Sequence, residues 1–256
     1  MKHITRPLGW MLILALLAAW EGIARSGLVE QVFFPPVSRI LVTFARLLLS
    51  GVLPYHIGAS LINMFAGYFL SVLVTVPFGI LLGTSRPLYN LFEPIIEFLR
   101  PLPTTAIVPA AMLFLGIGSL EKIFLIFFAC SKLMIVNTIY GARGTDPLLI
   151  ETARTYGYRR LQVIRRIILP AASPSIMTGL RISLAISIIL IIAVEMLGSD
   201  KGIGYYTILM QRSFSTTEMY AGVFALCILG YLLNRLFRLT EGRLMAWHAG
   251  ATAKQR

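Results

Sequence analysis

Charged residues are scarce in this sequence. Only 13% of its 256 residues are Asp, Glu, Lys or Arg, whereas 57% are hydrophobic. A soluble domain carries about 25% charged residues, which keep its surface in contact with water. The chain lacks that polar coat, so we expect an all-α membrane protein rather than a soluble globular one.

Cysteine and histidine are also scarce, with two and three copies. Cys130 and Cys227 lie within apolar runs, where a free thiol behaves as a small hydrophobic group. The sequence has no CxxC pair and no Cys/His cluster, so no metal site is expected. It has no phosphate-binding GxxxxGK[ST] loop either, so any ATP would have to be hydrolysed by another polypeptide.

Long apolar runs are what the sequence has instead. A helix needs about 20 mostly apolar residues to cross the hydrocarbon core. Six stretches meet this requirement and predict about six transmembrane helices in a single domain over residues 1–256, the first being a retained span rather than a cleaved signal peptide. The predicted spans are Leu8–Ala24, Ile57–Ser85, Arg100–Glu121, Ile123–Gly141, Pro174–Leu197 and Met219–Phe237. The third is expected to begin irregularly, around Pro101 and Pro103.

The basic residues set the orientation of these spans. The formal net charge is +12, but Lys and Arg mostly lie between apolar runs and form no basic face with aromatic residues, so nucleic-acid binding is not expected. With both termini in the cytoplasm, most Lys and Arg outside the spans lie on the cytoplasmic side, as the positive-inside rule requires. The exceptions are Arg25, Arg39, Arg46, Lys122, Lys201 and Arg212.

Two segments are not expected to span. Residues 35–50 have apolar residues at helical spacing and Arg39 and Arg46 on another side, which predicts a short interfacial helix outside the membrane. The longest cytoplasmic segment covers residues 142–172. From composition alone, a solvated loop that touches lipid is as good an explanation of it as a functional one.

The cytoplasmic segment predicts two short helices. Asp146 and Pro147 are an N-cap and a first helical residue, and Gly157 is a natural stop. A second helix is then predicted to end at Pro170, with one face formed by Leu161, Ile164, Ile167 and Ile168.

This segment resembles the EAA motif of binding-protein-dependent ABC importer permeases. The matching residues, in the spacing E-x-A-x3-G-x9-I-x-L-P, are Glu151, Ala153, Gly157, Ile167, Leu169 and Pro170. Thr152 stands where the motif usually has Ala. The resemblance implies a type I importer permease in the cytoplasmic (inner) membrane, and it implies that these six residues couple the permease to an ATPase.

Two further stretches are similar to the nitrate, taurine and alkanesulfonate branch of that family. They are residues 97–118, with an Arg-Pro-x-Pro segment and a Gly-Ile-Gly end, and residues 193–207, with Ala-Glu-Met before a Gly-rich turn. The branch implies a small, anionic solute delivered by an external binding protein. It also implies a two-fold permease assembly, for which a homodimer is expected, and two ATPase subunits that carry ATP and Mg²⁺, with no cofactor in this chain. The solute itself is left open among nitrate, taurine, other sulfonates, bicarbonate and vitamin precursors.

Ionisable residues inside spans are costly and are usually functional. Lys132, near the middle of the fourth span, would cost roughly 2.5 to 3.5 kcal/mol if it faced lipid, so we expect it to face the bundle interior, where it either attracts an anion or bonds to a carbonyl or carboxylate. Glu195 either lines the outer mouth of the pathway or bonds to the backbone of the Gly198–Gly204 turn. Arg181 is expected to reach the cytoplasmic headgroups.

Two other functions are weighed against the importer permease. An intramembrane enzyme would need a GxSxG, HExxH or paired-Asp arrangement within spans, and the sequence has none, so no enzymatic activity is expected. A non-transporting membrane scaffold is opposed by the EAA-like segment.

Overall fold

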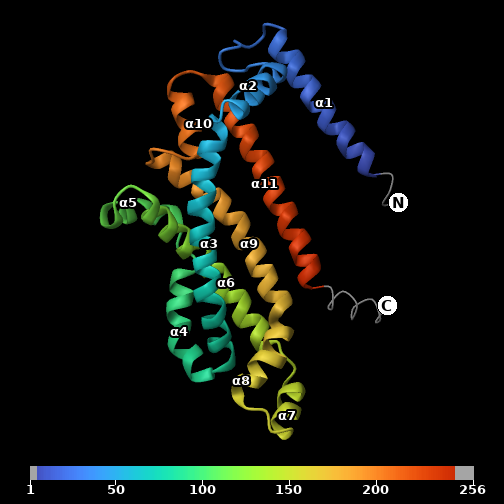
Figure 1. Ribbon diagram of the computed structural model, residues 1–256, viewed down its shortest axis with the longest axis vertical. Helices are drawn as coiled ribbons and strands as arrows, with labels where there is room; N and C mark the ends of the chain where they lie inside the picture. The colour runs from blue at the N-terminus through green and yellow to red at the C-terminus, as the bar shows by residue number, and fades with distance from the viewer. Residues whose placement is uncertain (1–4, 246–256) are drawn as a thin grey trace. The chain divides into compact units, whose positions relative to one another are not determined.

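The computed structural model describes residues 5–245, and every regular element within them is helical (Figure 1). In chain order the elements are α1 (Thr5–Arg25), α2 (Val37–Leu49), α3 (Val52–Thr84), α4 (Arg86–Leu99), α5 (Thr104–Leu115), α6 (Ser119–Arg143), α7 (Pro147–Thr155), α8 (Arg160–Val163), the π-helix η1 (Ile164–Ile168), α9 (Leu169–Leu197), α10 (Ile203–Arg212) and α11 (Thr216–Leu244).

Four stretches of the described chain are long and apolar enough to cross a membrane: Val52–Thr84, Ser119–Arg143, Arg160–Leu197 and Thr216–Arg243. They correspond to the second, fourth, fifth and last predicted spans. The first predicted span is helical as α1. The total of six spans stays a prediction, and so does the cytoplasmic placement of the termini, because residues 1–4 and 246–256 lie outside the described residues.

The third predicted span, over 100–121, is not a single helix, and the irregular start predicted at Pro101 and Pro103 coincides with a bend in the chain. α5 has only 12 residues, and it is joined to α4 at a bend of 95°. Pro101 and Pro103 lack the N–H groups that would continue α4. Gly116, at φ 73°, ends α5 before α6 begins. The sequence interpretation also missed α4, which it treated as a loop.

The chain forms two compact units. Unit 1 consists of residues 1–60 and 195–229, and unit 2 consists of residues 61–194 and 230–256. In unit 1, α2 lies where the interfacial helix is predicted. Phe44 and Leu47 of α2 pack on a core of Leu53, Ile203, Tyr206 and Ala225, while Arg39 and Arg46 are exposed.

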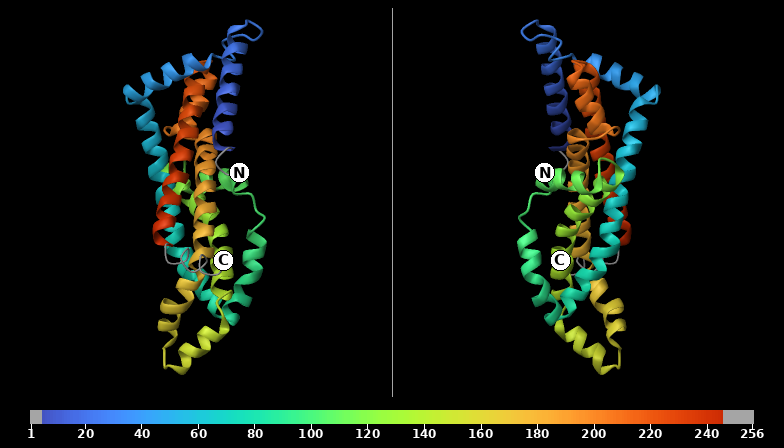
Figure 2. Two further views of the ribbon diagram at one scale, coloured as in Figure 1. Left: turned by 90° about the vertical axis from the view of Figure 1, so that its right-hand side faces the viewer. Right: turned by 90° about the vertical axis from the view of Figure 1, so that its left-hand side faces the viewer.

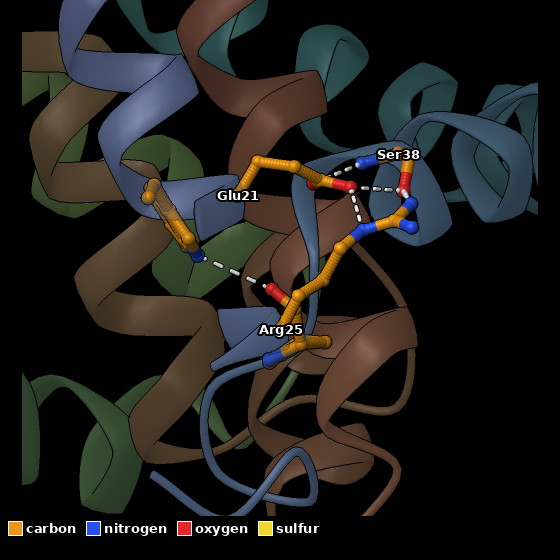
Figure 3. A network of polar contacts seen from close by, with 5 residues as sticks. Glu21, Arg25 and Ser38 are labelled. Carbon is orange, nitrogen blue, oxygen red and sulfur yellow. Dashed lines mark hydrogen bonds and ion pairs between the residues drawn. The ribbon is translucent and has the colours of Figure 1, made fainter. Parts of the chain in front are cut away.

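Glu21 fastens α1 to the start of α2 (Figure 3). Its carboxylate accepts hydrogen bonds from the Ser38 N–H (3.1 Å) and hydroxyl (2.8 Å) and pairs with Arg25 Nε at 2.7 Å. The first N–H groups of a helix have no partner within it, and the helix dipole favours a negative charge there. Glu21 therefore caps α2 from outside the helix.

Unit 2 is built on the close approach of three long helices. A Cβ added at Gly67, Gly79 or Gly83 of α3 would lie 2.6–2.8 Å from α6, and in each case a close contact is the residue 59 positions later, Ile126, Thr138 or Ala142. This constant separation means that α3 and α6 run parallel. In the same way, Gly141 meets Ala172 and Ser175, and Gly179 meets Asn137, so α6 and α9 run antiparallel. Small residues at such crossings let membrane helices pack through their backbones.

Candidate coupling loop and intramembrane charges

The segment between α6 and α9 forms a helical hairpin of α7 and α8 at one end of unit 2 (Figures 1 and 2). Asp146 caps α7, because its carboxylate accepts a 2.9 Å hydrogen bond from the N–H of Leu148. Pro147 fills the first helical position, where no N–H partner is needed. The predicted start of this helix is confirmed.

Gly157 ends α7 in a Schellman motif. The N–H of Tyr158 bonds to the carbonyl of Ala153 at 3.1 Å, and the N–H of Gly157 bonds to that of Arg154 at 2.9 Å. Gly157 has φ 81°, in the left-handed region that the sequence predicts for it. A Cβ at this position would meet no atom within 4 Å. The glycine is therefore required by the backbone conformation and not by crowding within the chain.

The hairpin has a small apolar core of its own. Ala153, Val163 and Ile168 are buried together with Ala142 of α6, and Ile164 and Ile167 pack against them. The prediction that Leu161 belongs to this face is wrong, since Leu161 is 57% exposed and Val163 takes the inward position. Ala153 and Ile167 thus belong to the core, whereas Glu151, Gly157 and Leu169 are exposed and Pro170 is half-buried.

Pro170 does not end the second helix, contrary to the prediction. The helix passes from α8 through η1 into α9, and the N–H of Leu169 bonds to the carbonyl of Ile164, five residues back. Proline in an α-helix clashes with the carbonyl four residues earlier. The wider π-turn immediately before Pro170 displaces that carbonyl, so the helix continues into the membrane span.

Beside the exposed residues Arg154, Arg159, Arg160, Arg165 and Arg166, the hairpin exposes several apolar side chains. Those most exposed are Leu148 (67%), Tyr156 (80%) and Leu161 (57%). A cavity of about 940 Å³ lies beside the hairpin. It is lined by the hairpin, by the start of α4 and by the ends of α3 and α6, and its lining residues include Glu151 and Arg86. In its lining, the Arg143 guanidinium contacts the ring of Tyr89, 3.5 Å from the ring centroid.

Lys132 lies halfway along α6 and is partly buried, and it lines a cavity within unit 2. Its ammonium donates to the carbonyl oxygen of Leu102 and lies 5.1 Å from the Phe128 ring centroid. Leu102 is in the break between α4 and α5, where carbonyls have no helical partner. Non-helical backbone at membrane depth needs such partners. Lys132 therefore bonds to a backbone carbonyl, which is one of the two roles that the sequence left open for it.

Glu195 is almost fully buried, at 1% exposed, near the end of α9. Its carboxylate accepts hydrogen bonds from the Ser60 hydroxyl (2.7 Å) and from the N–H of Gly204 (2.9 Å). The Ser60 oxygen in turn accepts the N–H of Ile203 at 2.9 Å, and His56 accepts that of Gly202 at 3.2 Å. The N-terminus of α10 is thus held by the Glu195 carboxyl group, the Ser60 hydroxyl and the His56 ring. This is the bonding to the turn that the sequence offered as an alternative to a pathway role.

The sequence interpretation missed Ser60 and His56, since an isolated polar residue in an apolar run carries no signal of its partner. It also missed the partner of Arg181. The Arg181 guanidinium lies 3.8 Å from the Glu241 carboxylate, and both belong to unit 2.

Comparison with known families decides what this chain is. The profile described as "Binding-protein-dependent transport system inner membrane component" matches residues 75–245. This range includes the hairpin, the cavity beside it and the cavity that Lys132 lines. The chain belongs to this family.

Relatives match over nearly the full length. The aliphatic sulfonates transport permease protein SsuC of Bacillus subtilis is 34% identical over 93% of this chain and 88% of its own. The taurine transport system permease protein TauC of Escherichia coli is 30% identical over 96% and 91%. The nitrate import permease protein NrtB of Leptolyngbya laminosa is 30% identical over 75% and 68%.

Solved structures show the same fold. An inward-facing MetNI methionine ABC transporter matches with a TM-score of 0.61 at 21% identity, over 71% of this chain and 92% of that one. This permease is therefore a multi-pass inner-membrane subunit of an ABC importer with the type I fold, and it is not an enzyme. The enzyme and scaffold alternatives are dropped.

Proposed function

We propose that this permease works as a homodimer that imports a small anionic solute, with two ATPase subunits on its cytoplasmic side and a solute-binding protein outside. ATP and Mg²⁺ bind to the ATPases. One chain offers one hairpin of α7 and α8, whereas a pair of ATPases offers two docking sites, so two copies of the permease complete the assembly.

The hairpin carries the coupling proposal. It exposes Leu148, Tyr156 and Leu161 to what the orientation predicts to be the cytoplasm, where these side chains are available to a partner protein. Behind them, Ala153 and Ile167 join the hairpin to α6 through a packed core. Helical continuity through Leu169 and Pro170 joins it to α9. A displacement of the hairpin by the ATPase is thereby transmitted to the two spans α6 and α9, with no flexible loop in between.

Glu151 lines the cavity of about 940 Å³ beside the hairpin, and Arg86 and Arg143 line the same cavity. We propose that it sets the position of the hairpin by its charge. Its place in the EAA-like spacing and its exposure agree with this role.

The anionic solute is supported by the relatives and by the charge inside unit 2. Three of the relatives are named for sulfonates, taurine and nitrate. Lys132 places a cation at mid-span, and we propose that it faces the solute pathway. For Glu195 we propose a structural role at α10, because its carboxyl group accepts hydrogen bonds from Ser60 and from the backbone of the turn.

Native mass spectrometry of the complex purified from its own membranes tests the assembly. The expected mass contains two copies of this chain and two ATPase chains. A single permease copy together with a different permease chain contradicts the homodimer but leaves the importer function standing. Recovery of the permease without any ATPase contradicts the coupling role of the hairpin.

A further inference from the structure

A small cavity of about 210 Å³ lies within unit 2, at the break between α4 and α5. Its polar lining consists of Arg100 and Thr104 from the two sides of the break and of Lys132 and Asn137 from α6. The other walls are apolar and include Ile186 of α9. Ligand pockets for drug-sized molecules measure about 300–1,000 Å³. This one has room for a small ion or for one end of a larger solute.

The charge of the cavity is unbalanced. Two cations line it, and no Asp or Glu does so among the described residues. Glu97 lies 3.7 Å from Arg100, but both side chains are about 60% exposed, and exposed pairs of this kind attract each other weakly. None of the ion pairs found within residues 5–245 involves Lys132.

The carbonyl bond of Lys132 does not account for its charge. An ammonium group has three N–H donors, and Leu102 takes one of them. A neutral amide or hydroxyl would cap this carbonyl without bringing a charge to the middle of a span. Asn137 likewise uses one amide N–H on the carbonyl of Leu133 and has a second. Lys132 and Asn137 therefore offer more hydrogen-bond donors, and Lys132 more positive charge, than the carbonyl at the break between α4 and α5 requires.

Resting on the importer function proposed above, we propose that Arg100 and Lys132, with Thr104 and Asn137, bind the anionic group of the solute as it passes. A guanidinium and an ammonium beside neutral donors suit an oxyanion such as a sulfonate or nitrate, because charge-assisted hydrogen bonds are the strong ones. The cavity discriminates against neutral and cationic solutes of the same size. It thus gives the permease a selectivity of its own in addition to that of the external binding protein.

The test is a titration of the purified full-length permease in detergent, followed by saturation-transfer NMR. Methanesulfonate is the probe, and dimethyl sulfone is its uncharged counterpart of nearly the same shape. Methanesulfonate is expected to bind saturably and at least about tenfold more tightly than the sulfone. Arg100→Gln and Lys132→Gln are each expected to weaken it by about tenfold or more, the factor that corresponds to one charge-assisted hydrogen bond. Gln at position 132 keeps a donor for the Leu102 carbonyl.

Arg181→Gln is the matched control. It removes the same charge from a residue that lies outside this cavity and pairs with Glu241, so methanesulfonate binding is expected to stay unchanged. Equal binding of the two probes, or unchanged methanesulfonate affinity in both cavity variants, overturns the proposal. If Lys132→Gln does not fold, Arg100→Gln decides, because the Arg100 side chain is largely exposed.

These outcomes are separable from the importer function. Co-purification of the ATPase is measured on the same preparations without added anion. A permease that assembles with its ATPase but shows no charge-dependent binding loses the anion site and keeps its function. A permease that binds methanesulfonate but no ATPase keeps the site and loses the coupling role.

Discussion

At the scale of single residues, the ionisable groups that the sequence marked as expensive have identifiable partners. Glu195 holds the start of α10, Lys132 holds the break after α4, and Arg181 pairs with Glu241. Sequence reasoning found the charges because an ionisable residue in an apolar run is conspicuous. It offered the backbone partners of Glu195 and Lys132 as alternatives, but it did not identify Ser60 or Glu241, which lie far along the chain from Glu195 and Arg181.

Gly202→Ala is expected to destabilise the protein through the Glu195 site. Gly202 has φ 119°, and a Cβ there would lie 2.2 Å from the Glu195 carboxylate. The change combines the strain of a backbone conformation (φ 119°, ψ 160°) that is essentially limited to glycine, about 1–3 kcal/mol, with displacement of the buried Glu195 carboxyl group from its hydrogen bonds. Thermal unfolding in detergent measures the effect as a lower Tm.

Gly51→Ala is the control for a glycine at positive φ without a steric contact, because Gly51 has φ 82° and open space where the Cβ would go. We expect its Tm to fall less than that of Gly202→Ala. Equal losses in the two variants would show that the contact with Glu195 contributes nothing.

At the scale of elements, the sequence predicts the parts whose signals are local. The Asp146–Pro147 start, the Gly157 turn and the apolar runs of α3, α6 and α11 all depend on neighbouring residues. α4 was missed because Glu93, Pro94 and Glu97 interrupt its apolar residues, so hydropathy favours a loop. The continuity through Pro170 was missed because it depends on a π-turn, which has no simple sequence pattern.

Substitutions at Gly157 separate two explanations of this glycine, namely the conformation of the turn and a close approach of the ATPase to its backbone. Asn adopts left-handed backbone at little cost, whereas Val, being β-branched, does not. If only the conformation matters, Gly157→Asn should keep most solute uptake and Gly157→Val should abolish it at normal membrane abundance. Uptake into cells, normalised to permease content by immunoblot, measures this.

If the ATPase approaches the backbone at Gly157 closely, both variants should fail, since any side chain then obstructs docking. The space around Gly157 within this chain is open, so such a failure of Gly157→Asn points to the partner. Normal uptake by Gly157→Val contradicts a coupling role for the turn altogether.

At the scale of the whole molecule, the number of spans depends on α4 and α5. α3 and α6 run parallel, so the chain must pass from the end of α3 back to the level of its start before α6 begins. The turn after α3 and the hairpin of α7 and α8 line the same cavity of about 940 Å³, which puts both at the same end of unit 2. Because α4 and α5 make up the segment between α3 and α6, we expect this bent pair to make the return crossing. If α1 also crosses the membrane, it adds to the bent pair and the four long spans, and the total is even. An even total agrees with both termini lying in the cytoplasm.

Cysteine labelling tests this return crossing. In a Cys227→Ser background, whose other thiol at Cys130 is buried, a single Cys is introduced at Leu88 in α4 or at Ile117 before α6. A membrane-impermeant thiol reagent is expected to label Ile117→Cys in intact spheroplasts and Leu88→Cys only after lysis. Thr152→Cys in the hairpin and Asp200→Cys before α10 serve as the inner and outer references, since both positions are exposed. Labelling of positions 88 and 117 from the same side would make α4 and α5 a re-entrant loop. The Arg-rich hairpin and the Arg86 turn would then lie on opposite faces of the membrane, against both the positive-inside rule and the cavity that they share.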